Sequence, residues 1–353
     1  MNEPAKVYVL CPDRPRPTGG MKTIYRHAEI LHDAGIAASV VHGRRGFRAD
    51  WFDNRCPVVA AEDVTLGPND VLLVPEIFVD AFGTRPPRRG WRQRLNPRAS
   101  KEEMPWDTLH PLIESASRLA ILSLNPYNTF HRSTLDELHP ANPYADPRLI
   151  GVLTISEDAE SYLQHAFPRV PVVRYTKAVD TSRFSPGSSK GLELCLMPRK
   201  HHKDAVQIIN LLRVRGALEG VELTVIDGLQ EPEVAEIMQR SLVFLSLSHA
   251  EGLPRPPMEA MLCECLVVGY HGQGGKEYIK PPHALPFEEG DVVGVARALE
   301  NVLDSLRRDA AAFDEQRRLG REFILSRYRP EIEEAEVLAF WRNALKQRLG
   351  QPI

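Results

Sequence analysis

The sequence has few cysteines, and none of them stands in a C-x-x-C pair. The five are scattered along the chain as Cys11, Cys56, Cys195, Cys263 and Cys265. An odd, dispersed set of this kind argues against a disulfide framework and against a structural zinc site. It fits a protein of a reducing compartment.

Long apolar stretches and an excess of one charge are also missing. No window of about 18 uninterrupted apolar residues occurs, and the first ten residues, MNEPAKVYVL, lack a basic segment followed by a long apolar one. The 44 Lys and Arg residues nearly balance the 47 Asp and Glu residues, for a net charge of -3. We expect a cytoplasmic protein, with peripheral attachment at the inner membrane face as a further option. Nucleic acid is disfavoured as a partner without being excluded, because no global positive field attracts it.

What is present is an ordinary globular composition, with 43% hydrophobic and 26% charged residues over 353 positions. That length gives room for two domains. Short apolar runs alternate with helical patterns from the N-terminus onward, and continuous runs of this kind are typical of parallel strands covered on both faces. The runs of the first half lie at residues 6–12, 36–42, 70–75, 119–124, 151–155 and 170–175.

The same alternation restarts after a polar segment rich in Ser, Pro and Gly at residues 181–190. Its strands are expected at 193–197, 221–226, 242–247 and 266–270, and the pattern beyond Gly290 is helical. We therefore predict an N-terminal domain at 1–180, a connector at 181–190, a C-terminal domain at 191–330 and a last helix at 331–353. On that helix Trp341, Ala344, Leu345 and Leu349 share one face. Each half is a doubly wound α/β domain, and ligands of such sheets bind beyond the carboxyl ends of the strands.

The most informative stretch runs from residue 242 to 279. A strand there delivers Glu251, a Gly252-Leu253-Pro254 turn and a helix started by two prolines, with Glu259 in its first turn. Carboxylates accept hydrogen bonds from sugar hydroxyls, and the amides at a helix start favour an anion such as a phosphate. The alternative is an acidic loop whose charges complement the helix dipole.

This stretch resembles glycosyltransferase family 4, which comprises retaining nucleotide-sugar enzymes of the GT-B fold. Glu251, Gly252, Glu259, Ala260 and Met261 match its Glu-x7-Glu motif. Residues 274–279, GGKEYI, are similar to its GG-x-x-E segment, and residues 179–186, VDTSRFSP, to its interdomain VD-x-x-x-F-x-P signature. The resemblance implies two Rossmann-like domains facing a central cleft, with a C-terminal helix that returns to the N-terminal domain.

The resemblance also implies roles for single residues. Glu251 corresponds to the glutamate that contacts the transferred sugar, and Glu259 to the one that contacts the nucleotide ribose. Arg199 and Lys203 correspond to the cations that hold the donor diphosphate, with Lys200 as a substitute for Lys203. Fixed cations are useful there because the leaving nucleoside diphosphate gains negative charge. The alternative is a solvated basic helix start.

In the N-terminal half the resemblance rests on a glycine loop. Gly19 and Gly20 follow the first strand, where glycine lets the backbone approach a phosphate or sugar. The full G-x-G-x-x-G fingerprint is missing, which counts against a nicotinamide or flavin enzyme. Where the family carries a histidine, this chain has Asn125 and Tyr127, and either could take its place. The alternative for Asn125 is a residue that bonds its own backbone at the strand end.

We expect catalysis without a metal and without a bound cofactor beyond the nucleoside diphosphate sugar. No D-x-D motif occurs, and the His and Cys spacings show no compact metal cluster. His201 and His202 are adjacent, but an exposed dipeptide at a helix start is the preferred interpretation. No nucleophile stands in a triad-like arrangement, so the leaving phosphate itself is the expected base.

The acceptor is not encoded in a recognisable motif. Residues 84–101 hold six arginines around Trp91 and could meet a phosphorylated lipid carrier, an anionic surface, an acidic glycan or nucleic acid. A solvated loop is the alternative. With retention implied by the family resemblance, the sequence thus predicts a retaining glycosyltransferase acting on an unidentified acceptor, which could be a glycan, a lipid carrier or another anionic molecule. A nucleotide-sugar epimerase on the same fold and a non-catalytic polyanion-binding scaffold are the alternatives.

Overall fold

The computed structural model describes residues 5–16, 18–81, 106–130, 133–138 and 142–346. The chain forms two compact units. The first unit comprises Met1–Ile155, Ala159–Tyr175 and Glu334–Ile353, and the second comprises Ser156–Asp158 and Thr176–Glu333. The main part of the second unit begins at Thr176, a few residues before the polar segment that the composition marks as a connector.

The first unit is built on a seven-stranded parallel sheet with the strand order β3-β2-β1-β4-β5-β6-β7. Its central strands are the continuous apolar runs seen in the sequence, and their side chains are buried on both faces. The short edge strand β3 is too brief to stand out as such a run. The strands are β1 (Val7–Leu10), β2 (Ala38–His42), β3 (Val58–Ala60), β4 (Val71–Pro75), β5 (Leu119–Ser123), β6 (Leu149–Thr154) and β7 (Val172–Arg174).

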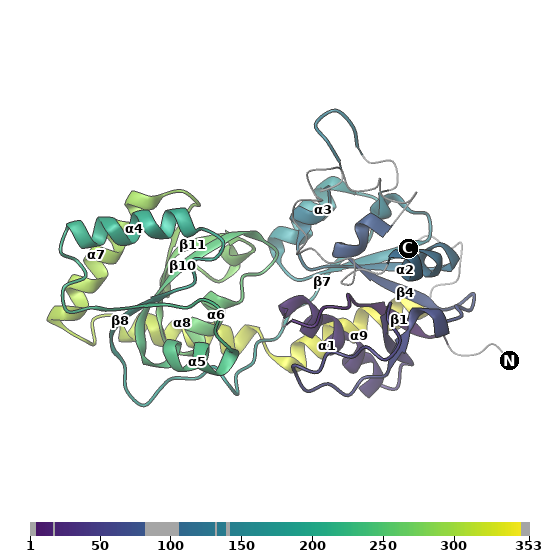
Figure 1. The fold of residues 1–353 in the computed structure, drawn as a ribbon, viewed down its shortest axis with the longest axis horizontal. Helices are drawn as coiled ribbons and strands as arrows, with labels where there is room; N and C mark the ends of the chain where they lie inside the picture. The colour runs from purple at the N-terminus through teal and green to yellow at the C-terminus, as the bar shows by residue number, and fades with distance from the viewer. Residues whose placement is uncertain (1–4, 17, 82–105, 131–132, 139–141, 347–353) are drawn as a thin grey trace. The chain divides into compact units, whose positions relative to one another are not determined.

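Helices cover both faces of this sheet. Helix α1 (Gly19–Asp33) and helix α9 (Pro330–Lys346) lie side by side on one face, as Figure 1 shows. The buried Trp341 of α9 donates a hydrogen bond from Nε1 to Nε2 of His27 in α1, at 2.7 Å. Helix α2 (Trp106–Ser115) packs on the opposite face through Leu109, Leu112 and Ile113. Helix α3 (Glu157–Ala166) follows β6. The predicted return of the C-terminal helix to the N-terminal domain is confirmed.

The second unit has a five-stranded parallel sheet with the order β12-β11-β10-β8-β9. Four of its strands coincide with the predicted runs. The edge strand β12 is additional, and its Pro286 is tolerated because an edge strand needs fewer backbone donors. The strands are β8 (Gly191–Leu196), β9 (Glu222–Val225), β10 (Ser241–Glu251), β11 (Leu266–Gln273) and β12 (Ala284–Phe287).

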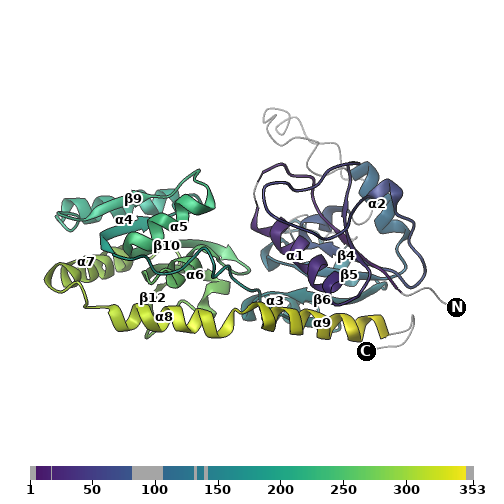
Figure 2. The same ribbon diagram turned by 90° about the horizontal axis from the view of Figure 1, so that it is seen from below.

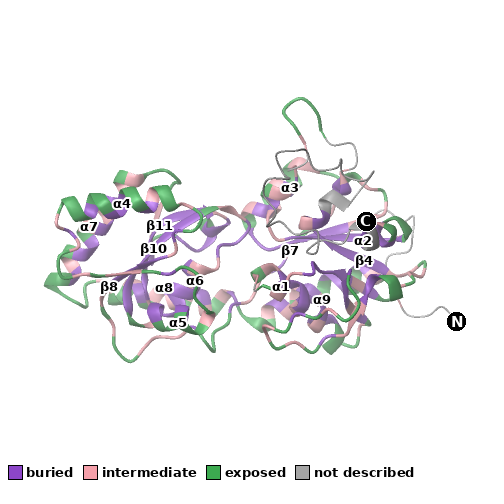
Figure 3. Ribbon diagram, viewed as in Figure 1, coloured by how far each residue is buried: buried purple, intermediate pink, exposed green. Residues whose placement is uncertain are grey.

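Two helix layers enclose the second sheet. Helix α4 (His202–Val214) and helix α7 (Val292–Arg308) pack together over one face, with a core that includes Ile208, Leu212, Leu299 and Leu303. Helices α5 (Glu231–Arg240), α6 (Pro256–Leu262) and α8 (Asp314–Arg327) cover the other face, and α8 lies beside α6 (Figure 2). The central strands of both sheets are buried, as Figure 3 shows. The predicted α/β fold with two Rossmann-like halves is therefore correct.

The strand order of each sheet reverses at one point. In the second sheet β8 lies between β9 and β10, so the chain leaves β8 toward one edge and leaves β10 toward the other. In the first sheet the corresponding point lies between β1 and β4. Loops diverge at such a reversal and leave a crevice beyond the carboxyl ends of the strands. The segments after β8 and β10 are therefore where a ligand site of the second unit is expected.

Among the helices within the described ranges, none has both the length and the apolar character needed to cross a membrane.

Candidate active site

Glu251 is the last residue of β10 and stands at the reversal of the second sheet. The ladder between β10 and β11 shifts register between Ser248 and Glu251, and Glu251 then aligns with Gln273 of β11. Its carboxylate Oε2 lies 2.5 Å from Nζ of Lys200 in the segment after β8. The side chains of Glu251 and Lys200 are 23% and 37% exposed. An ion pair thus joins the two segments that diverge at the crevice.

Lys200 is therefore engaged, whereas its basic neighbours are not. Arg199 and Lys203 are exposed, and no hydrogen bond or ion pair to them occurs among the residues whose positions the structure describes. Lys203 lies in the first turn of α4. The sequence offered Lys200 only as a substitute for Lys203. The structure assigns the two lysines different surroundings, one beside a carboxylate and one in solvent.

Glu259 stands in the first turn of α6, as the two prolines predict. Helix α6 begins at Pro256, and Glu259 is 8% exposed. Its Oε1 lies 3.0 Å from a terminal guanidinium nitrogen of Arg255. The guanidinium and the carboxylate are 22% and 11% exposed, so each still reaches solvent. The pair keeps a charged carboxylate balanced at a partly buried position.

The turn between Glu251 and α6 is tightly packed. Gly252, Leu253 and Pro254 are all buried, and the hydroxyl of the buried Tyr278 donates a hydrogen bond to the carbonyl of Pro254. Burial raises the pKa of Tyr278 well above its ordinary value, so its phenol remains a donor. The side chain of Leu253 points into protein.

Residues 274–279, the segment that resembles GG-x-x-E, pack against this turn. A Cβ atom on Gly274 would lie 1.9 Å from the carbonyl oxygen of Gly252, so no side chain fits there. Glu277, 6% exposed, accepts a hydrogen bond from the backbone N–H of Glu157 at 2.9 Å. It also accepts one from the hydroxyl of Tyr328 at 2.5 Å. Gly274 and Glu277 therefore both stabilise the packing of the second unit.

In the first unit, Gly19 and Gly20 are the first two residues of α1. The side chain of Thr18 caps this helix by accepting a hydrogen bond from the Met21 N–H at 3.2 Å. A Cβ atom on Gly20 would meet only Leu124, at 3.9 Å. Packing within the unit therefore does not require glycine at Gly20. Both glycines follow β1, at the strand-order reversal of the first sheet.

Asn125 follows β5 and caps a short 3-10 helix, η4 (Pro126–Asn128). Its side-chain oxygen accepts a hydrogen bond from the Tyr127 N–H at 3.1 Å. This is the backbone-bonding role that the sequence left open beside a catalytic one. Tyr127 is 36% exposed and stacks edge-on against Tyr162. Residues 84–101, the arginine-rich segment around Trp91, lie outside the described residues.

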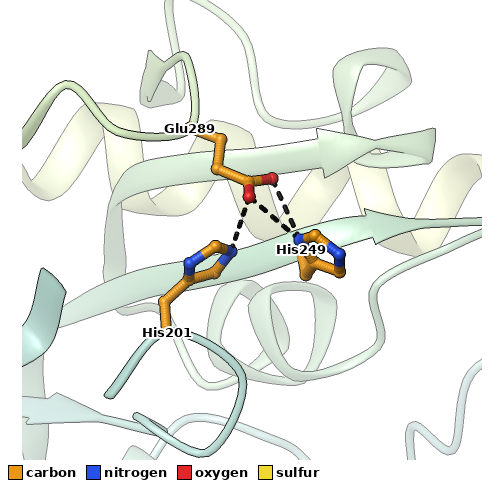
Figure 4. A group of neighbouring side chains, drawn as sticks. All are labelled: His201, His249 and Glu289. Carbon is orange, nitrogen blue, oxygen red and sulfur yellow. Dashed lines mark hydrogen bonds and ion pairs between the residues drawn. The ribbon is translucent and has the colours of Figure 1, made fainter. Parts of the chain in front are cut away.

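One group of side chains was not anticipated. His201, His249 and Glu289 lie together, as Figure 4 shows, although they come from three separate segments. Interpreting His201 and His202 as an exposed dipeptide is correct for His202 and wrong for His201, whose side chain is only 14% exposed. The adjacency of His201 and His202 was the only signal in the sequence. Nothing in the spacing links residue 201 to residue 249 or residue 289.

Comparisons with known proteins address the fold and the chemistry. Residues 213–319 match the family model of glycosyl transferases group 1. A curated relative, the alpha-1,6-glucosyltransferase of Actinobacillus pleuropneumoniae serotype 7 (strain AP76), is 24% identical over 272 residues. That alignment covers 75% of this chain and 72% of the relative.

The similar solved structures are glycosyltransferases, and each matches this chain over nearly the whole length of both chains. Sucrose-phosphate synthase from Thermosynechococcus elongatus has a TM-score of 0.64 at 12% identity, covering 96% of this chain and 98% of that one. HepE of Anabaena in complex with UDP-glucose has a TM-score of 0.63 at 12% identity, covering 96% and 99%. Staphylococcus aureus TarM, in complex with fondaparinux, alpha-GlcNAc-glycerol and UDP, has a TM-score of 0.62 at 9% identity, covering 97% and 100%. The fold is thus GT-B, and together with the group 1 match this makes the chain a glycosyltransferase.

Proposed function

We propose that this protein transfers a sugar, with retention of anomeric configuration, from a nucleoside diphosphate sugar to a glycan acceptor. The observation that carries the proposal is the Lys200–Glu251 ion pair at the strand-order reversal of the second sheet. It places an oriented carboxylate where ligands of doubly wound sheets bind. On the segment beside it, the side chains of Arg199 and Lys203 have no hydrogen bond or ion pair with the residues that the structure describes.

Glu251 is proposed to hold the transferred sugar. A carboxylate accepts hydrogen bonds only, and sugar hydroxyls donate them. The Nζ atom of Lys200 lies 2.5 Å from the Glu251 carboxylate and orients it. Because the carboxylate is 23% exposed, part of it remains open to a ligand. Lys200 is therefore a positioning residue in this scheme.

Arg199 and Lys203 are proposed to hold the diphosphate. Both are exposed and unpaired within the described part of the second unit, so a bound anion would not have to displace an existing partner. As the bond to the sugar breaks, negative charge grows on the leaving diphosphate, and fixed cations lower that barrier. The leaving phosphate then takes the proton of the acceptor hydroxyl. Glu259, steadied by Arg255, is proposed to accept hydrogen bonds from the ribose hydroxyls.

The donor proposed first is UDP-glucose. The curated relative is named a glucosyltransferase, and solved structures of similar fold are complexes with UDP or UDP-glucose. A glycan acceptor is proposed because the same relative is named for an alpha-1,6 linkage. We further propose that the transfer itself needs no divalent ion, since Arg199 and Lys203 supply positive charge at the diphosphate.

The test is donor turnover by the purified full-length chain and by Glu251→Gln. The proposal expects release of UDP from UDP-glucose, accelerated by a glucan oligosaccharide and insensitive to EDTA. In Glu251→Gln we expect kcat to fall by about 100-fold or more. The matched control is Glu236→Gln, an exposed glutamate of α5 that should leave turnover unchanged. Circular dichroism of each variant checks that it is folded.

Product analysis separates the possible outcomes. Transfer with retention gives an α-linked glucose on the acceptor, which NMR of the anomeric proton identifies. An epimerase would instead convert the nucleotide sugar with no acceptor present. Full activity of folded Glu251→Gln, or a β-linked product, would refute the proposal.

A further inference from the structure

Three segments of the second unit bring two imidazoles and a carboxylate to one place. His201 is the residue before α4, His249 lies near the end of β10, and Glu289 lies between β12 and α7. One ligand atom from each residue lies within 4.8 Å of the others. We infer that His201, His249 and Glu289 form a binding site for a transition-metal dication of the zinc class. This inference does not depend on the proposed function.

The distances suit a metal after a small adjustment. Glu289 Oε1 lies 3.0 Å from Nδ1 of His249 and 3.2 Å from Nε2 of His201 (Figure 4). Ligand atoms about 2.1 Å from a tetrahedral zinc ion are about 3.4 Å from one another. The two carboxylate–imidazole separations are already close to that value. The two imidazole nitrogens lie within 4.8 Å of each other and would move to about 3.4 Å apart around a bound ion.

The state of His201 points to the same conclusion. Its Nε2 atom is shielded from solvent and makes no well-directed hydrogen bond, even though Glu289 is 3.2 Å away. A buried imidazole nitrogen without a hydrogen bond is costly. A metal ion would use the lone pair of that nitrogen, and Glu289 already faces it. The site therefore contains an unsatisfied nitrogen aimed at the position of the ion.

Asp204 and Tyr270 lie beside His201. Its other nitrogen, Nδ1, faces Oδ2 of Asp204 at 3.9 Å, and Asp204 accepts a hydrogen bond from the hydroxyl of Tyr270 at 2.9 Å. The ring of Tyr270 packs edge-on against His201, with the ring centroids 5.5 Å apart. Metal-binding histidines commonly donate a hydrogen bond from their second nitrogen to a carboxylate that fixes the ring. His201 Nδ1 faces Asp204 in this sense, at a separation of 3.9 Å that is longer than a hydrogen bond.

The ligand set selects the kind of metal. Two imidazole nitrogens and one carboxylate suit zinc and its neighbours, whereas magnesium and calcium prefer oxygen ligands only. The side chains of His249 and Glu289 are 57% and 38% exposed, so an ion can enter and can keep a water as its fourth ligand. A site with three protein ligands and one open position should bind its metal ion reversibly.

The site is placed to fasten the loops of the crevice. His201 directly follows Lys200, and His249 is two residues before Glu251. A metal bound by both histidines would cross-link the two segments that the Lys200–Glu251 ion pair joins. Metal binding should therefore stabilise the second unit, because the ion binds the folded arrangement and not the unfolded chain.

The test uses the full-length chain after removal of metals with EDTA. Equilibrium dialysis with zinc should show one bound ion per chain, and cobalt should give the visible absorption of a tetrahedral site. His249→Ala and Glu289→Gln should each weaken zinc binding at least tenfold and remove the cobalt bands. The matched control is His202→Ala, since His202 is exposed and next to His201. All five cysteines are buried, so they should not compete in the folded protein.

The outcomes separate a metal site from a hydrogen-bonded cluster. Asp204→Asn, which keeps all three ligands, should weaken zinc binding roughly 10-fold. A zinc-dependent rise in melting temperature should accompany binding in wild type and be absent in Glu289→Gln. Equal zinc affinity in wild type and Glu289→Gln, or an equal loss in His202→Ala, would overturn the inference. Because the readouts are binding and stability, they do not depend on any transferase activity.

Discussion

At the residue scale, the two lysines near Glu251 have different environments and should have different effects on kinetics. We expect Lys200→Ala to lower kcat about 10-fold or more, because Glu251 loses the ammonium that orients it. Lys203→Ala should mainly weaken UDP binding, since Lys203 is exposed and its side chain has no hydrogen bond or ion pair with the described residues. Steady-state kinetics and UDP titration measure the two effects. Lys200→Arg, which keeps the charge, should recover part of kcat. Identical losses in both alanine variants would contradict these separate roles.

At Gly274, the addition of a single carbon atom should decide whether the protein keeps its stability. A methyl group at Gly274 would collide with the Gly252 carbonyl at 1.9 Å, and neither atom can move away unless the backbone shifts. We expect Gly274→Ala to cost more than about 3 kcal/mol of stability. Gly191→Ala is the control, because a Cβ atom there meets nothing within 4 Å. Thermal unfolding followed by circular dichroism compares the two, and a normal melting temperature for Gly274→Ala would disprove the close approach.

The site could be predicted only in part at this scale. Glu251 and Glu259 stand out because their spacing resembles a known motif and two prolines mark the helix start. The pairing of Lys200 with Glu251 could not be predicted from the sequence, since it depends on β8 and β10 being neighbours in the sheet. The same holds for His201, His249 and Glu289, whose proximity arises from the strand order and not from local sequence.

At the scale of elements, the docking of α9 on α1 contains a buried titratable group. Burial lowers the pKa of His27 to about 3, and its neutral Nε2 accepts the hydrogen bond from Trp341. Between about pH 6.5 and pH 3 the unfolded chain binds a proton at His27 that the folded chain does not. Stability should therefore fall as the pH drops below about 6.5, by up to about 1.4 kcal/mol per pH unit.

The measurement is the free energy of unfolding in urea at pH 7.0 and pH 5.0. Wild type should lose about 2 kcal/mol more than His27→Gln over this interval, because glutamine can accept the Trp341 hydrogen bond but does not titrate. Equal pH dependence in the two proteins would show that His27 is not the group responsible.

Strand prediction succeeded for the buried central strands and missed two of the four edge strands, β3 and β12. β4 and β5 are five-residue runs with every side chain buried, and these are visible in the sequence. β3 has three residues and β12 contains Pro286, so neither produces the signal of a buried strand. Both are edge strands, where one neighbour is missing and the demand for apolar side chains is lower.

At the scale of the whole molecule, α9 should matter for one unit and not for the other. Trp341 is fully buried within the first unit, and replacing such a side chain with alanine typically costs about 3–5 kcal/mol. We expect Trp341→Ala to reduce amide protection in β1, β4 and β5 while β8, β10 and β11 keep theirs. Hydrogen exchange with mass spectrometry resolves the two sets of peptides. The control is Arg342→Ala, the exposed neighbour on the same helix. Loss of protection in both units would contradict the division.

The path of the chain also sets the order in which its parts can be finished during synthesis. The first unit begins at the N-terminus but includes residues from Glu334 onward, whereas the second unit needs nothing beyond Glu333. On the ribosome, all strands of the first sheet emerge early and must wait for α9 before Trp341 can cover His27. The second unit ends at Glu333, so all of its residues have been added to the chain before Trp341 is. The part of the protein made first is therefore the part completed last.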